Sequence, residues 1–76
     1  MKYRVYISFR HGILDPEAEA IRKTVHSAGF KNISKLSKGK FFDIELKNNS
    51  KKEIEKLSEK ILSNPIIEEY EIEKIK

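Results

Sequence analysis

Two stretches of this chain, GILDPEAEAI at residues 12–21 and ILSNPIIEEYEIE at residues 61–73, determine how its secondary structure is arranged. Each contains a proline at a point where the chain geometry changes. Pro16 occupies a helix start, where its missing N–H costs nothing, and Pro65 follows a helix end that it cannot continue. The first stretch therefore predicts the start of a helix. The second predicts a helix that passes directly into a strand.

The residues before the first stretch predict a strand. Residues 2–10 alternate apolar and polar side chains, the pattern of a half-buried strand. The helix that follows is expected to be capped by Asp15 and to end at Gly29, which can adopt the left-handed conformation of a helix C-terminus. The face that the strand is expected to bury consists of Tyr3, Val5, Ile7 and Phe9.

The middle of the chain, residues 31–47, is predicted to be extended, with a bulge, bend or hairpin turn near residues 38–40. One bent strand and two short strands both fit this pattern. Ser50 and Glu53 have the spacing of a capping box and predict the start of a second helix, which ends at Asn64. Residues 66–75 predict a final strand with an acidic outer row.

The predicted order is strand, helix, extended segment (bent strand or hairpin), helix, strand, in a single domain over residues 1–76. This order predicts an α+β fold: a two-layer sandwich with an antiparallel sheet and two helices on one face, related to the ferredoxin-like plan. The other face of the sheet would carry Tyr6, Phe41 and Ile67 among charged side chains. We expect those apolar groups to be covered by another surface, most simply a second copy of the sheet.

Size and composition point to self-association. A chain of 76 residues buries only about 60% of the surface that its unfolded form exposes. The sequence has no cysteine and 2 histidines, so disulfides and metals offer little compensation. A homodimer or higher oligomer is expected.

Charge and hydropathy limit the classes of partner. The net charge is +4, but the basic and acidic side chains are interspersed, which predicts a solvated surface rather than a nucleic-acid site. No segment approaches the roughly 20 apolar residues of a membrane span, and residues 1–10 do not resemble a signal peptide. We therefore expect no nucleic acid, no membrane and a cytoplasmic location.

The sequence has no recognisable catalytic, cofactor-binding or metal-binding constellation. His11 and His26 have no spacing that would build a metal site or a triad. Gly39 and Lys40 resemble the end of a phosphate loop, but Phe41 replaces the required hydroxyl residue. The glutamates lie along expected solvated faces. No catalytic, cofactor or metal residue is predicted on this chain.

Two alternative functions remain open at this point. KGKFFDIEL, residues 38–46, is comparable to the third-strand motif of an RNA-recognition module, although Lys40 and Glu45 occupy positions where aromatic residues are usual. A ferredoxin-like small-molecule regulatory domain is the other alternative. Salt dependence separates RNA binding from a protein interface, because phosphate contacts weaken steeply with ionic strength.

Taken in order, GILDPEA at residues 12–18, AGF at residues 28–30, GKFF at residues 39–42 and LSNPIIEEYEIE at residues 62–73 resemble PurS. PurS is the small subunit of the bacterial and archaeal phosphoribosylformylglycinamidine synthase complex. The resemblance implies a non-catalytic assembly subunit in de novo purine biosynthesis. It would bridge a glutaminase subunit and an ATP- and magnesium-using synthetase subunit and support ammonia transfer. That complex is a glutamine-dependent C–N ligase that converts formylglycinamide ribonucleotide, ATP and glutamine to the amidine.

The resemblance also implies which residues matter. Lys40 and Tyr70 are the candidates for partner contacts, because neither is needed for a turn or a cap. Two departures from the family pattern are visible. Ala18 stands where the family often has glycine, and Ser37 stands where it commonly has arginine, whose contact Lys38 or Lys35 could supply. The family-motif residues expected to fix turns and caps are Gly12, Asp15, Pro16, Gly39, Asn64 and Pro65.

Overall fold

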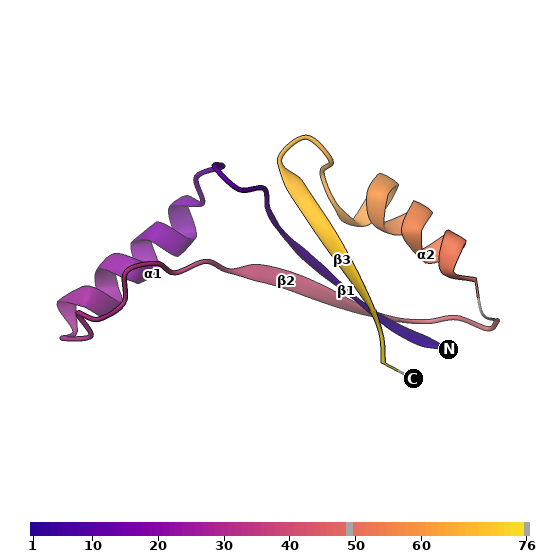
Figure 1. Ribbon diagram of the computed structural model, residues 1–76, viewed down its shortest axis with the longest axis horizontal. Coiled ribbons are helices and arrows are strands. Elements are labelled where there is room, and N and C mark those ends of the chain that lie inside the picture. The colour runs from indigo at the N-terminus through magenta and orange to yellow at the C-terminus, as the bar shows by residue number, and fades with distance from the viewer. Residues whose placement is uncertain (49, 76) are drawn as a thin grey trace.

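The computed structural model describes residues 1–48 and 50–75 (Figure 1). Residues 49 and 76 lie outside the described part. The predicted α+β class and element order are confirmed, and a single strand lies between the two helices. The elements are β1 (Lys2–Phe9), α1 (Pro16–Ser27), β2 (Gly39–Glu45), α2 (Lys51–Leu57), the π-helical turn η1 (Ser58–Leu62) that continues α2, and β3 (Glu68–Lys74).

The three strands form one antiparallel sheet in the order β2-β1-β3, with β1 in the centre. Val5 lies opposite Phe42 on one side and Ile72 on the other. Residues that lie directly opposite one another share a face of the sheet. The register therefore places the apolar rows of all three strands on one face, as the alternation in the sequence predicted.

Helix α2 covers that apolar face. Its Ile54 is completely buried and packs with Tyr3, Val5 and Ile7 to form the core. Leu62 of η1 packs against the same cluster. Because this core is small, the chain depends on a few large side chains for its stability.

Helix α1 lies differently. It extends beyond the end of the sheet, beside the segment that leads into β2 (Figure 1). Its only buried residue is Ala18, while Ile21 is 39% exposed and Leu14, just before the helix, is 72% exposed. Between the end of β1 at Phe9 and the start of α1, residues 10–15 carry the chain past the sheet. Of the two helices, α2 therefore supplies the cover that the sheet receives from its own chain.

The overall shape is elongated. The principal extents are 48 × 27 × 14 Å, and the radius of gyration is 15.6 Å. A compact chain of this length would have a radius of gyration of about 11 Å. Such a shape leaves apolar side chains of α1 facing solvent in the isolated chain.

Two helix ends test the predictions made from the residues next to them. Gly29 has φ +104°, and the amide of Phe30 donates to the carbonyl of Val25 at 3.2 Å, as in a Schellman turn. The predicted capping box at Ser50 is wrong, because the Ser50 side chain makes no cap hydrogen bond. Helix α2 is held instead by its packing through Ile54.

Ile67, which was expected on the second face of the sheet, lies before β3 begins and is half-buried.

Within the described residues, no helix combines the length and the apolar character needed to cross a membrane.

Candidate functional site

The sheet places Lys40 and Tyr70 on one face, with the central strand β1 between them. Lys40 on β2 and Tyr70 on β3 both lie opposite Ile7, so they flank this core residue on the face that α2 covers in part. Lys40 is exposed, and Tyr70 is 36% exposed. The Lys40 Nζ lies 5.8 Å from the centroid of the Phe42 ring. The two candidates therefore form one surface, called here the Lys40–Tyr70 site.

Gly39 has a structural role beside this site. It was expected near a turn, but it is the first residue of β2 and lies opposite Ser8. A Cβ at this position would lie 2.5 Å from the backbone oxygen of Ile7. Only glycine lets β2 approach β1 this closely, so Gly39 sets the position of Lys40 next to it.

The turn before α1 is built by Asp15. Its Oδ1 accepts hydrogen bonds from the amides of Glu17 (3.1 Å) and Ala18 (3.2 Å), and Pro16 occupies the first position of the helix. Lys38 Nζ lies 3.6 Å from Asp15 Oδ2 and 3.5 Å from Glu17 Oε2. Lys38 thereby ties the segment before β2 to the start of α1, next to Ser37. Gly12 in the preceding turn has φ +88°.

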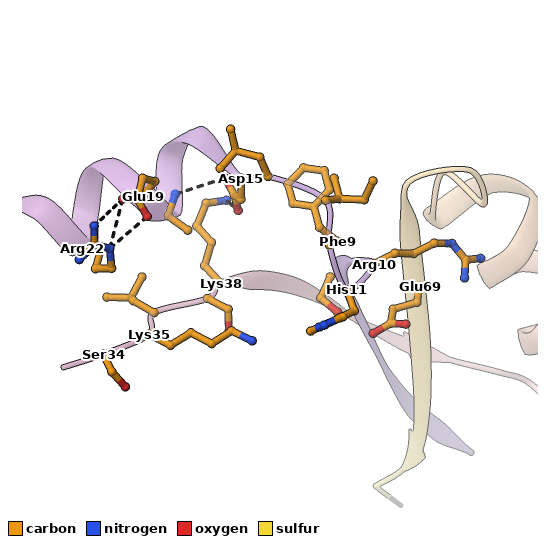
Figure 2. Close-up of a pocket in the computed structure, with 17 residues that line it drawn as sticks. Phe9, Arg10, His11, Asp15, Glu19, Arg22, Ser34, Lys35, Lys38 and Glu69 are labelled. Atoms are coloured by element: carbon orange, nitrogen blue, oxygen red, sulfur yellow. Dashed lines mark hydrogen bonds and ion pairs between the residues drawn. The ribbon is translucent and has the colours of Figure 1, made fainter.

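An open cleft of about 520 Å³ lies between the end of β1, the start of α1 and residues 34–38 (Figure 2). Several of the charged side chains that line it form ion pairs with one another. Arg22 donates to both carboxylate oxygens of Glu19 at 2.6 to 3.2 Å, which holds the pKa of Glu19 below its ordinary value. In residues 1–48 and 50–75, no group of three His, Cys, Asp or Glu side chains is placed to hold a metal ion. Of the charged pairs at the cleft, Arg22–Glu19 lies within α1, and Lys38 joins the start of α1 to the segment before β2.

The turn at Asn64 and Pro65 is fastened to the far end of β1. Asn64 Oδ1 accepts from the amide of Ile66 at 3.1 Å, and Glu68 Oε1 accepts from the amide of Asn64 at 2.7 Å. The Arg10 guanidinium donates twice to the carbonyl of Pro65, at 2.9 and 3.1 Å. Sequence reasoning missed Arg10, because its partner is a backbone carbonyl distant in the sequence. Ile66, in the same turn, is 82% exposed.

The RNA-binding alternative is disfavoured by the placement of the KGKFFDIEL segment. Phe42 lies on the face that α2 covers, opposite Val5, rather than on the open face where bases would stack. The open face carries Phe41 next to Asp43, whose carboxylate accepts from Arg4 at 2.7 and 3.1 Å. This donation holds the pKa of Asp43 below its ordinary value and keeps it anionic. Anionic side chains on this face would repel a phosphate backbone.

Comparison with known proteins identifies the family. The model of the family described as "PurS: Phosphoribosylformylglycinamidine (FGAM) synthase" matches residues 2–76. A phosphoribosylformylglycinamidine synthase subunit PurS from Archaeoglobus fulgidus is 40% identical over 72 residues, which cover 90% of each chain.

Solved structures agree with this match. The PurS structure from Methanocaldococcus jannaschii is 36% identical, covers 99% of this chain and 98% of its own, and superposes with a TM-score of 0.84. A chain in the structure of PurLQS from Thermotoga maritima is 27% identical, with 97% of this chain and 95% of that chain covered and a TM-score of 0.85. This chain belongs to the PurS family of phosphoribosylformylglycinamidine synthase subunits.

Proposed function

We propose that this chain is the non-catalytic assembly subunit of phosphoribosylformylglycinamidine synthase, and that it bridges the glutaminase and the ATP-dependent synthetase subunits. The observation that carries this proposal is the similarity, over nearly the whole chain, to a chain in the PurLQS complex of Thermotoga maritima. In this role the chain supports transfer of ammonia from the glutaminase to the synthetase. The synthetase performs the chemistry with ATP and magnesium in the cytoplasm.

A second part of the proposal is that the chain acts as a homodimer or a higher oligomer. Its radius of gyration of 15.6 Å exceeds the compact value of about 11 Å. The apolar side chains Leu14 and Ile21 remain exposed near and on α1, which has no sheet of its own chain beneath it. A second copy would bury this surface and add to a core that is small.

Sedimentation equilibrium is expected to report a dimer or larger species at micromolar concentration. The physical reason is that burial of apolar surface on association stabilises the folded chain at about 25 cal/mol per Å². A folded monomer that persists throughout the micromolar range would contradict this part of the proposal.

The Lys40–Tyr70 site is proposed as a contact with an enzyme subunit. Lys40 and Tyr70 lie on the same face of the sheet, on either side of Ile7 of β1, and both side chains are accessible. Tyrosine is enriched among residues that dominate binding energy at interfaces. The site also adjoins Gly39, so a rigid strand rather than a mobile loop presents it.

Replacing Lys40 or Tyr70 with alanine is expected to lower glutamine-dependent synthesis in the reconstituted complex. Truncating a central interface residue costs about 1 to 2 kcal/mol, which weakens binding about tenfold. Synthesis from added ammonium bypasses the glutaminase and should fall much less. Both rates are measured with each variant at limiting concentrations of this chain.

Two further variants sharpen this measurement. Lys52→Ala removes an exposed lysine from α2 and should leave both rates unchanged. Tyr70→Phe keeps the ring, so it separates the contribution of the hydroxyl group from that of ring packing. Equal loss of both rates in the Lys40 and Tyr70 variants, or no loss in either variant, would contradict the assignment of this site.

A further inference from the structure

The face of the sheet opposite α2 is uncovered within this chain, and we call it the outer sheet face. It carries every second residue of each strand, from Lys2 on β1, Gly39 on β2 and Glu69 on β3. The side chains of the core, by contrast, all lie on the other face with Ile54. The outer sheet face is therefore a regular surface that the fold of this chain leaves without a covering layer.

The charge of this face is opposite to that of the chain. Among the strand residues that form it, five carboxylates stand against the basic side chains of Lys2 and Arg4, a net charge of −3 at neutral pH. The chain as a whole carries +4. The five carboxylates are Asp43, Glu45, Glu69, Glu71 and Glu73.

The row on β3 is the uncompensated part of this charge. Arg4 binds Asp43 through two hydrogen bonds, at 2.7 and 3.1 Å, so its guanidinium is already engaged on the β2 side. Alternate residues of a strand are about 7 Å apart, within the roughly 8 Å Debye length of physiological salt. Glu69, Glu71 and Glu73 therefore repel one another in the free chain, and a cationic surface would relieve that repulsion.

An aromatic pair lies next to the acidic row. Tyr6 is opposite Glu71 on one side and Phe41 on the other. The two rings have their centroids 6.3 Å apart and are 37% and 55% exposed. The Arg4 guanidinium already lies 4.5 Å from the centroid of the Phe41 ring. Exposed rings beside carboxylates offer an incoming arginine or lysine both a cation–π contact and an ion pair.

We propose that the outer sheet face docks a basic protein surface, bearing arginine or lysine, on one of the enzyme subunits that this chain joins. The proposal rests on the proposed function and adds a second contact surface, on the face of the sheet opposite the Lys40–Tyr70 site. A second copy of the same face is a poor occupant, because stacking two such faces would oppose two net charges of −3. The carboxylates make a nucleic acid an equally poor occupant.

The test replaces the acidic row in the full chain with Glu69→Gln, Glu71→Gln and Glu73→Gln together. Binding to the purified synthetase and glutaminase subunits is measured, singly and in combination, across a salt series. We expect binding to weaken at least tenfold at roughly 50 mM salt and to converge with the unmodified chain near roughly 500 mM, where charges are screened. Binding lost to only one of the two subunits would identify the one that this face contacts.

A matched control removes the same number of charges elsewhere. Glu53→Gln, Glu55→Gln and Glu59→Gln alter exposed carboxylates of α2 and η1, on the opposite side of the sheet. This control should bind as the unmodified chain does. Equal weakening by both triple variants would overturn the proposal, because net charge rather than this face would then be responsible.

A second pair of changes tests the apolar part of the surface. Tyr6→Ser with Phe41→Ser should weaken binding several-fold at both low and high salt, while circular dichroism reports an unchanged fold. A change in oligomeric mass caused by the acidic-row variant would overturn the proposal in favour of a second copy. Failure of the unmodified chain to support glutamine-dependent synthesis would instead refute the proposed function itself, whatever the variants do.

Discussion

Replacing Ile54 with alanine is expected to remove a large part of the free energy of unfolding of the chain at 25 °C. Ile54 is completely buried and is the residue through which α2 packs on Val5 and Ile7. Truncation of a buried isoleucine to alanine costs about 2 to 5 kcal/mol, because apolar contacts are lost and a cavity remains. A chain of this length has a total stability of the order of 4 to 11 kcal/mol. One side chain therefore accounts for a large share of the total.

Urea unfolding followed by circular dichroism measures this effect. All variants are compared at one protein concentration, because association couples stability to concentration. Ile61→Ala is the matched control: the same substitution is made in η1 at a side chain that is 74% exposed, and a change within about 0.5 kcal/mol is expected. A similar cost for both variants would show that the core is not organised around Ile54.

Replacing Gly39 with alanine is expected to cost about 1 to 3 kcal/mol and to loosen the start of β2. The new Cβ would lie 2.5 Å from the backbone oxygen of Ile7 in the central strand, an atom that cannot move without displacing β1. Whether the substitution lowers or raises the free energy of unfolding shows whether this contact exists. At a position without such a contact, glycine to alanine stabilises a protein by about 0.4 to 1 kcal/mol, through loss of freedom in the unfolded chain.

Hydrogen exchange locates the damage caused by Gly39→Ala. Faster exchange is expected in the paired segments around Ser8 and Lys40, while β3 is affected less, because β3 pairs with β1 from the other side. Ser37→Ala is the control, since it alters an exposed residue outside the strand. A stabilised Gly39→Ala variant would refute the steric explanation for this glycine.

The elements themselves were predictable from the sequence, because their signals are local. Pro16 begins a helix, Gly29 ends it through a positive φ, and Pro65 separates the second helix from β3. Each of these depends on the conformational range of one residue and its immediate neighbours. The capping box at Ser50 failed for the same physical reason that limits all such signals: packing through Ile54 can hold a helix without the cap.

The candidate site was predictable only in part. Lys40 and Tyr70 could be singled out because no turn or cap requires them. Their placement on either side of Ile7 depends on the registers of two separate strand pairs. Arg10 was missed because its partner is the carbonyl of Pro65, and every residue offers a carbonyl of that kind.

The sequence by itself determined the strand and helix order, the apolar row of β1 and the family, because periodicity and short ordered motifs are properties of the chain. Only the tertiary structure decided that α1 lies beyond the sheet, that Gly39 is required by contact with Ile7, and that one face of the sheet is left acidic and open. These features depend on which strands pair and in which register. A shift of one residue in either pairing would turn the apolar row of β2 or β3 away from Tyr3, Val5 and Ile7, so burial beneath Ile54 disfavours such registers.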